Sequence, residues 1–179
     1  ELKAEGKIGA LGLTNVNKQY LAEFSERFDI ASLQAQVSLF DRRVERGEGQ
    51  LCREKNIKIL AYGTLLGGFV SEKWLHQKEP SQETLENRSL VRYKLIIDSA
   101  CGWDEFQRRL FMLSKLAKKY RCEIANITIA ALLQTGRADS VIVGLSPQNF
   151  AAQNRSLAVL PVLEAQDLQE LSSWTCHFH

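Results

Sequence analysis

Apolar residues follow two different spacings along the chain, and the two spacings alternate. Short apolar runs predict buried strands at residues 8–15, 30–37, 58–63 and 140–144. Apolar residues three and four positions apart predict helices at residues 18–28, 44–56, 104–120, 124–134, 147–159 and 164–174. Strands that alternate with helices indicate an α/β fold built from parallel β-α units.

Residues 71–102 fit neither spacing. They contain Pro80 and many polar side chains, so they predict an irregular excursion with one short apolar piece at 93–97. Periodicity alone leaves two architectures open, an open doubly wound sheet and part of a closed β/α barrel.

Composition narrows the classes of protein. The chain has 179 residues, with 45% hydrophobic and 25% charged residues, which is enough for one domain with a real core. The net charge of +2 gives no broad field that favours nucleic acid or an anionic membrane, and no apolar run is long enough to span a bilayer. The sequence does not begin with Met, so we expect a processed, truncated or incompletely known start.

The cysteines show no metal or redox spacing. Cys52, Cys101, Cys122 and Cys176 are far apart, so we interpret them as reduced thiols in an intracellular, reducing compartment. The last residues, 174–179, contain possible metal ligands, but a frayed tail is the expected structure.

Two segments resemble the aldo-keto reductase family, in particular its bacterial and plant-type members. They are residues 6–15 (GKIGALGLTN) and 59–74 (ILAYGTLLGGFVSEKW). The resemblance implies an NAD(P)H-dependent oxidoreductase domain with an α/β TIM-barrel fold. It covers only the C-terminal half, about strands five to eight, which is not closed on its own. We expect one partial domain over 1–179: strands five to seven in 1–70, the excursion in 71–103, helices and the last strand in 104–174, and a tail in 175–179.

The resemblance also implies a set of cofactor-binding residues. Thr14, Asn15 and Gln34 match positions that bind the nicotinamide carboxamide, and Tyr62 matches the aromatic residue that stacks on the nicotinamide ring. Each has a structural alternative: Asn15 could simply end a strand, and Tyr62 could be a core tyrosine. The loop expected near the pyrophosphate supplies Gly63, Thr64, Leu65, Gly67 and Gly68, and the segment after the last strand supplies Ser146, Gln153 and Asn154.

Cations that bind the 2′-phosphate of NADP in some family members are missing here. Gly144 and Phe150 stand where those members have Lys and Arg, and Arg155 lies one position off. The resemblance therefore implies NAD(P)H, leaves open whether it is bound, and makes tight recognition of a 2′-phosphate doubtful.

Family members carry their catalytic Tyr, Lys, Asp and His upstream of the first segment, so we expect no catalytic residue in this chain. A half barrel has open sheet edges, so we expect other protein chains to cover its open face in a larger assembly. The main hypothesis is a catalytically inactive scaffold subunit. The alternatives are the C-terminal fragment of an active reductase and a non-catalytic dinucleotide-binding module. The plant-type resemblance makes a plastid or another organelle a further possible location.

Overall fold

The structure, a computed structural model, describes residues 2–144 and 156–176. Its strands form one parallel sheet in the order β1-β2-β3-β4. They are β1 (Leu11–Thr14), β2 (Ile30–Gln36), β3 (Lys58–Tyr62) and β4 (Ser140–Val141). Strands β1 and β4 are the two edges, so the sheet is open, as expected for half of a barrel.

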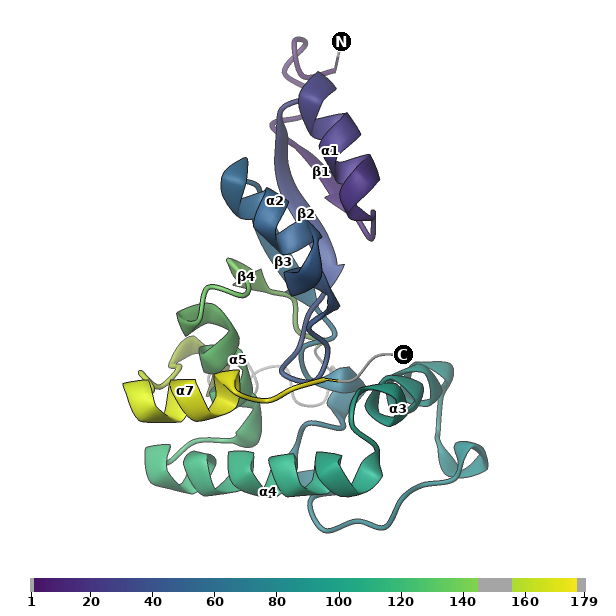
Figure 1. Cartoon of the computed structure of the whole chain (residues 1–179), viewed down its shortest axis with the longest axis vertical. Coiled ribbons are helices and arrows are strands. Elements are labelled where there is room, and N and C mark those ends of the chain that lie inside the picture. The colour runs from purple at the N-terminus through teal and green to yellow at the C-terminus, as the bar shows by residue number, and fades with distance from the viewer. Residues whose placement is uncertain (1, 145–155, 177–179) are drawn as a thin grey trace.

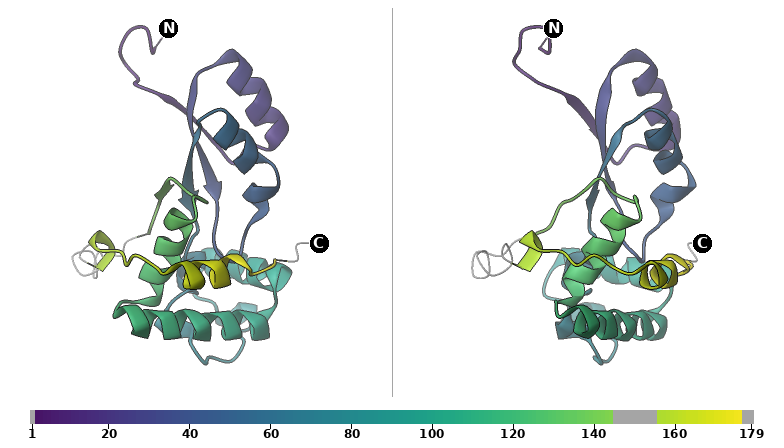
Figure 2. Two further views of the ribbon diagram at one scale, coloured as in Figure 1. Left: turned by 60° about the vertical axis from the view of Figure 1, so that its left-hand side comes forward. Right: turned by 90° about the vertical axis from the view of Figure 1, so that its left-hand side faces the viewer.

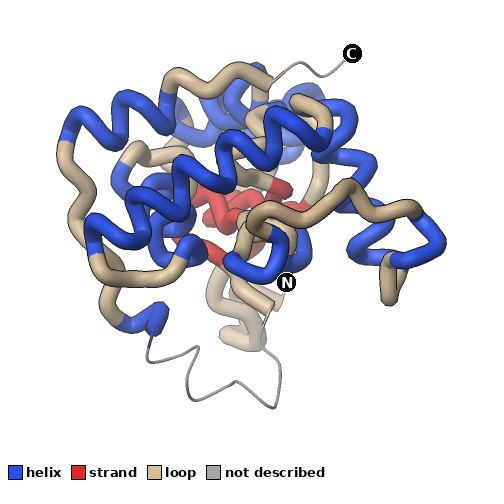
Figure 3. The backbone as a smooth tube through the Cα atoms, turned by 90° about the horizontal axis from the view of Figure 1, so that it is seen from below, coloured by secondary structure: helices blue, strands red, loops and turns tan. Residues whose placement is uncertain are grey.

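Helices cover the sheet and gather at one end of it. They are α1 (Lys18–Arg27), α2 (Glu48–Glu54), α3 (Arg88–Ala100), α4 (Trp103–Tyr120), α5 (Ile124–Gln134) and α7 (Ala165–Ser172). Helices α1 and α2 lie alongside the sheet, and α3, α4 and α7 lie at the end toward which β1 to β3 run (Figures 1 and 2). Seen from below, the strands lie at the centre with helices on most sides (Figure 3).

The prediction of an irregular segment over 71–102 was wrong for its second half. Residues 71–87 contain only the short 3-10 turns Glu72–Trp74 and Gln82–Thr84, but α3 follows as a 13-residue helix. The Asn87 side chain caps this helix by accepting a hydrogen bond from Leu90 N at 2.9 Å. The spacing of apolar residues did not predict this helix because Lys94 interrupts its buried face. This buried lysine lies between buried Leu90 and Ile97 and pairs with Glu79 and Asp98.

Several predicted boundaries also shifted. The first and last strands are shorter than predicted, and the predicted helix at 44–56 is a 3-10 turn (Arg43–Arg46) followed by α2. Most of the predicted helix at 147–159 lies outside the described residues; 156–158 are helical. Trp174 and Cys176 are buried, so the chain is packed up to residue 176, where we expected a frayed tail.

A cluster of aromatic rings joins the sheet to the helical layer. Phe40, which follows β2, lies 5.2 Å from Phe106 of α4 and 5.6 Å from Trp174, measured between ring centroids. Phe69, which follows β3, lies 4.5 Å from Trp74. Rings in such contact bury large areas, so this cluster fixes the segments that leave the carboxyl ends of β2 and β3.

Candidate active site

Candidate residues from three strands converge at the carboxyl end of the sheet. The Tyr62 hydroxyl donates to Asn15 Oδ1 at 2.9 Å, which joins the ends of β3 and β1. Between them lies Gln34 of β2, whose carbonyl accepts from Asn15 N at 3.0 Å and from Thr14 Oγ1 at 3.3 Å. The strand segments that carry Thr14, Asn15, Gln34 and Tyr62 therefore lie side by side, although these residues are up to 48 positions apart in sequence.

Asn15 owes its orientation to an unusual backbone conformation. Its φ of 52° lies in the left-handed region, which asparagine tolerates better than most other residues. The chain turns sharply there, and the Asn15 side chain stays exposed at the strand end. Its structural role and its candidate binding role are thus compatible, because the turn that ends β1 also presents the amide.

Several backbone amides of the glycine-containing loop after β3 form hydrogen bonds within the loop. Its backbone amides at Leu66 and Gly68 donate to the carbonyls of Gly63 and Leu65, at 3.0 and 2.9 Å. Phe69 N and Val70 N also donate to carbonyls within the loop. The Thr64 side chain is buried, so only part of this predicted segment faces a ligand in this conformation.

Tyr93 of α3 explains the need for two of the glycines. A Cβ at Gly63 would lie 2.7 Å from the Tyr93 hydroxyl, and a Cβ at Gly67 would lie 2.7 Å from Tyr93 Cδ2. Both glycines also have positive φ, 68° and 65°. The position of this tyrosine could not be predicted from the sequence, because the apolar pattern did not predict α3. Burial raises the pKa of the Tyr93 phenol, so the hydroxyl stays protonated at neutral pH.

A buried carboxylate organises the polar side chains beside Tyr62. Asp41 is 0% exposed and accepts from Gln36 Nε2 at 2.6 Å. It also accepts from the Arg43 guanidinium at 2.9 and 2.7 Å. On the other side, Arg92 of α3 donates to Gln36 Oε1 at 3.2 Å. This network ties α3 to β2. The only sign of this network in the sequence was Gln36, which lies two positions after Gln34 and so faces the same side of the strand.

A model of the Aldo/keto reductase family matches residues 1–175. The chain belongs to the aldo/keto reductase family. It is 26% identical over 165 residues to the NADH-specific methylglyoxal reductase of Escherichia coli, covering 88% of this chain and 48% of that protein. It is 27% identical over 171 residues to the probable aldo-keto reductase 1 of Glycine max, covering 96% of this chain and 47% of that protein.

Solved structures agree with the family assignment. The glycerol dehydrogenase of Gluconobacter oxydans superposes with a TM-score of 0.78 at 20% identity, over 96% of this chain and 50% of that one. The holo form of an aldo-keto reductase from Bacillus halodurans gives 0.62 at 22% identity, over 95% of this chain and 52% of that one. At such low identity the likeness establishes the fold. The chain spans about half the length of these relatives, so its four-stranded sheet corresponds to about half of an aldo-keto reductase barrel.

The predicted adenine-end residues Ser146, Gln153 and Asn154 lie outside the described residues, as do Phe150 and Arg155. Gly144, where some family members have a cation, is described and exposed. The described residues therefore include the strand ends of the candidate site but not the segment expected near the adenine.

A tyrosine, a lysine and an aspartate do meet elsewhere in the half barrel, at the junction of α4 and α7. Tyr120 donates to Asp167, and Lys119 Nζ lies 2.8 Å from the same carboxylate. Glu164 N donates to the Tyr120 hydroxyl at 2.8 Å. This group fixes the start of α7, and none of its members comes from the strand ends that carry the candidate site.

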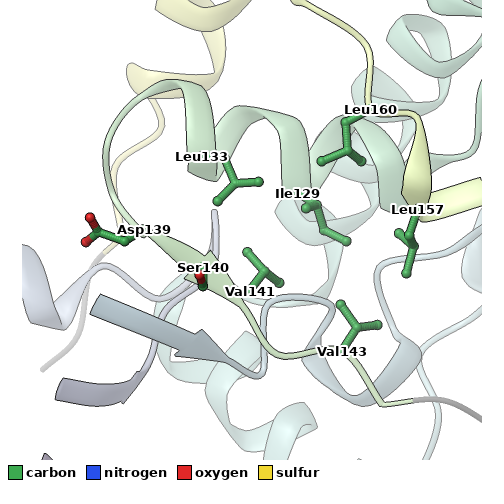
Figure 4. Close-up of a pocket in the computed structure, with 8 residues that line it drawn as sticks. All are labelled: Ile129, Leu133, Asp139, Ser140, Val141, Val143, Leu157 and Leu160. Atoms are coloured by element: carbon green, nitrogen blue, oxygen red, sulfur yellow. The ribbon is translucent and has the colours of Figure 1, made fainter. Parts of the chain in front are cut away.

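A groove of about 390 Å³ lies between α5 and β4 and contains none of the predicted site residues. Its apolar side chains, Ile129, Leu133, Val141, Val143, Leu157 and Leu160, surround one hollow (Figure 4). Within residues 2–144 and 156–176, no group of His, Cys, Asp and Glu could hold a metal ion. Nor is any described helix long and apolar enough to cross a membrane.

Proposed function

We propose that this chain supplies the nicotinamide-binding half of an NAD(P)H-dependent aldo-keto reductase that reduces a carbonyl substrate. The observation that carries the proposal is the convergence of Tyr62, Asn15 and Gln34 at the carboxyl ends of three adjacent strands. In a β/α barrel, this end of the strands is the ligand-binding end. The family assignment and the named NADH specificity of the bacterial relative support the choice of cofactor.

The side chains present fit a nicotinamide carboxamide. Asn15 Oδ1 accepts from Tyr62, and we see no partner for Asn15 Nδ2 among the described residues, so that nitrogen is available to donate to the carboxamide oxygen. The half-buried Tyr62 ring is held by the same hydrogen bond, which suits it to stack on a flat ring. When bound, the cofactor supplies the hydride. These residues orient its ring.

We propose that the proton donor lies in the part of the barrel that this sequence does not cover, together with the structure that completes the open edges. Edge strand β1 lies beside α1, whose Tyr20 and Phe24 are exposed one turn apart, and Phe28, which follows the helix, is also exposed. The other edge, β4, is flanked by the apolar groove. Unpaired strand edges next to exposed apolar surface favour association with a further strand-and-helix unit. A complementary half barrel of four β-α units fits this requirement.

Two asparagine variants test the assignment of the nicotinamide site. Asn15→Ala and Asn56→Ala remove the same amide from two exposed residues with nearly equal backbone φ, 52° and 55°. Both variants incur the same backbone strain, and Asn15→Ala also loses the hydrogen bond from Tyr62, so it should be slightly less stable than Asn56→Ala. Calorimetric titration with NADH and NADPH should show about fivefold weaker binding only for Asn15→Ala, because roughly 1 kcal/mol of hydrogen bonding is lost. Equal affinities of the two variants would contradict the assignment.

The scaffold role stays a second proposal, favoured by the loop after β3. Tyr93 packing accounts for Gly63 and Gly67 without any cofactor, and the amides of Leu66, Gly68, Phe69 and Val70 are satisfied within the loop. Native mass spectrometry of the gently purified protein, with sequencing of every co-purifying chain, separates the two roles. A companion that carries a catalytic tyrosine supports the reductase, whereas a large assembly that lacks such a chain supports the scaffold.

A further inference from the structure

A second cavity, of about 280 Å³, lies between α2 and α5. Its lining residues are Arg42, Val44, Glu45, Gly49, Arg53, Ile59, Thr135, Gly136, Arg137 and Ser172. Ile59 lies near the start of β3, whereas Tyr62 ends that strand. The cavity is therefore separate from the candidate nicotinamide site.

The charges that line this cavity do not balance. It contains the guanidinium groups of Arg42, Arg53 and Arg137 but only one carboxylate, that of Glu45. Glu45 accepts from Arg42 at 2.8 and 2.6 Å, and it also lies 3.2 Å from Arg137 Nε. Two guanidinium groups thus share one carboxylate. With Arg53, the lining carries two more positive than negative charges.

Arg137 is the most constrained of these cations. Its side chain is only 8% exposed, and burial, opposed by Glu45 and reinforced by Arg42, lowers its pKa. A buried guanidinium needs a counter-charge, because removing it from water is costly. Glu45 meets this need only in part, since the same carboxylate forms a two-bond pair with Arg42.

We propose that this cavity is a binding site for a small phosphate-type oxyanion, held between Arg53 and Arg137. Guanidinium groups match such anions in shape and charge and bind them through paired hydrogen bonds. The cavity is also large enough for such an anion. Its volume of about 280 Å³ lies at the lower end of the range of about 300–1,000 Å³ typical for drug-sized ligands, so a phosphate or a small phosphate ester fits.

A purely structural role explains part of this cluster. Arg42 Nη1 donates to the carbonyls of Ser172 and Trp174 at 3.0 and 2.7 Å, so Arg42 holds the end of α7. A structural role explains Arg137 only in part, since the contact between Arg137 Nη2 and the Ser172 carbonyl is 3.5 Å long. It does not explain Arg53, for which we see no hydrogen bond or ion pair with a described residue. Arg53 is thus the residue that distinguishes an anion site from a set of helix caps.

The test uses inorganic phosphate and glycerol phosphate as probes. Each is titrated into the full chain by calorimetry, in a phosphate-free buffer at constant ionic strength. Arg53→Gln removes an exposed charge at the cavity, and Lys55→Gln removes an exposed charge just beyond the same helix, outside the lining. Because both positions are exposed, both variants should fold.

We expect saturable binding of one anion per chain, about tenfold weaker in Arg53→Gln and unchanged in Lys55→Gln. Tighter binding of the ester would identify the ligand as the phosphate group of a small molecule, and tighter binding of phosphate would identify a free anion. Absence of saturable binding, or equal weakening by both substitutions, would overturn the proposal. Since none of the candidate nicotinamide residues lines this cavity, Arg53→Gln should leave NADH affinity unchanged, so this test and that of the nicotinamide site fail independently.

Discussion

Replacing Asp41 by alanine should destabilise the protein strongly, since this carboxylate is the centre of the polar network beside Tyr62. The substitution removes the bond from Gln36 at 2.6 Å and two bonds from Arg43 at 2.9 and 2.7 Å. The Arg43 side chain is 54% exposed and can be rehydrated. Gln36 is only 7% exposed, so its Nε2 would lose its partner in a site that water barely reaches.

The magnitude follows from these environments. Hydrogen bonds to a charged group contribute about 1.5–3 kcal/mol, and an unpaired buried donor costs about 1–3 kcal/mol. Because the two effects overlap, we expect Asp41→Ala to lower the free energy of unfolding by roughly 2–4 kcal/mol. For a chain of this size, that corresponds to a fall in Tm of about 5–15 °C.

Urea unfolding followed by tryptophan fluorescence measures this change, and Asp29→Ala is the matched control. Asp29 also accepts from a cation, Lys3 at 2.8 Å, but its side chain is 85% exposed. Its removal should leave the unfolding midpoint within experimental error. If the two aspartate variants were equally stable, the buried network would not exist as described and the reasoning would be refuted.

Three further predictions concern packing and ionisation. Gly67→Ala should destabilise the protein more than Gly136→Ala in the same urea experiment. The two glycines have nearly equal φ, 65° and 67°, but only a Cβ at Gly67 would lie within 3 Å of Tyr93. Equal losses of stability would contradict the Tyr93 contact. Phe106→Ala in α4 should cost about 3–5 kcal/mol, whereas Phe111→Ala in the same helix should cost far less, since Phe106 is 0% and Phe111 42% exposed. Burial raises the pKa of Cys52 and Cys101 to about 11, so iodoacetamide at pH 8 should label them slowly in the native protein, as mass spectrometry would report. Because these pKa values exceed the ordinary thiol pKa of 9.0, the free energy of unfolding should fall as pH rises from about 9 toward 11.

The sequence predicts the sheet well because its strands are short apolar runs set between helices. The order and parallel direction of β1 to β4 follow from that alternation together with the family resemblance. Helix α3 escaped detection because Lys94 occupies a buried position that periodicity expects to be apolar. Its charge is met by Glu79 at 2.7 Å, 15 positions away, which no local pattern reveals.

In the candidate site, too, some residues could be predicted from the sequence and others depend on tertiary packing. Thr14, Asn15, Gln34 and Tyr62 could be named from motifs because each lies at or near the carboxyl end of a strand, in a segment that resembles the family. The contacts of Tyr93, Asp41 and Arg92 could not be predicted, because they depend on where α3 packs against the loop after β3. The glycines after β3 illustrate the limit of a motif: the sequence indicates that glycine is needed there, and the structure supplies Tyr93 as one reason.

The most direct test of the nicotinamide site is saturation-transfer difference NMR of NADH with the purified chain. If Tyr62 and Asn15 receive the nicotinamide ring, irradiation of protein methyl groups should transfer saturation to the nicotinamide protons, and the transfer should weaken in Asn15→Ala but persist in Asn56→Ala. Saturation confined to the adenine protons, or none at all, would contradict the proposal that this half barrel binds the nicotinamide.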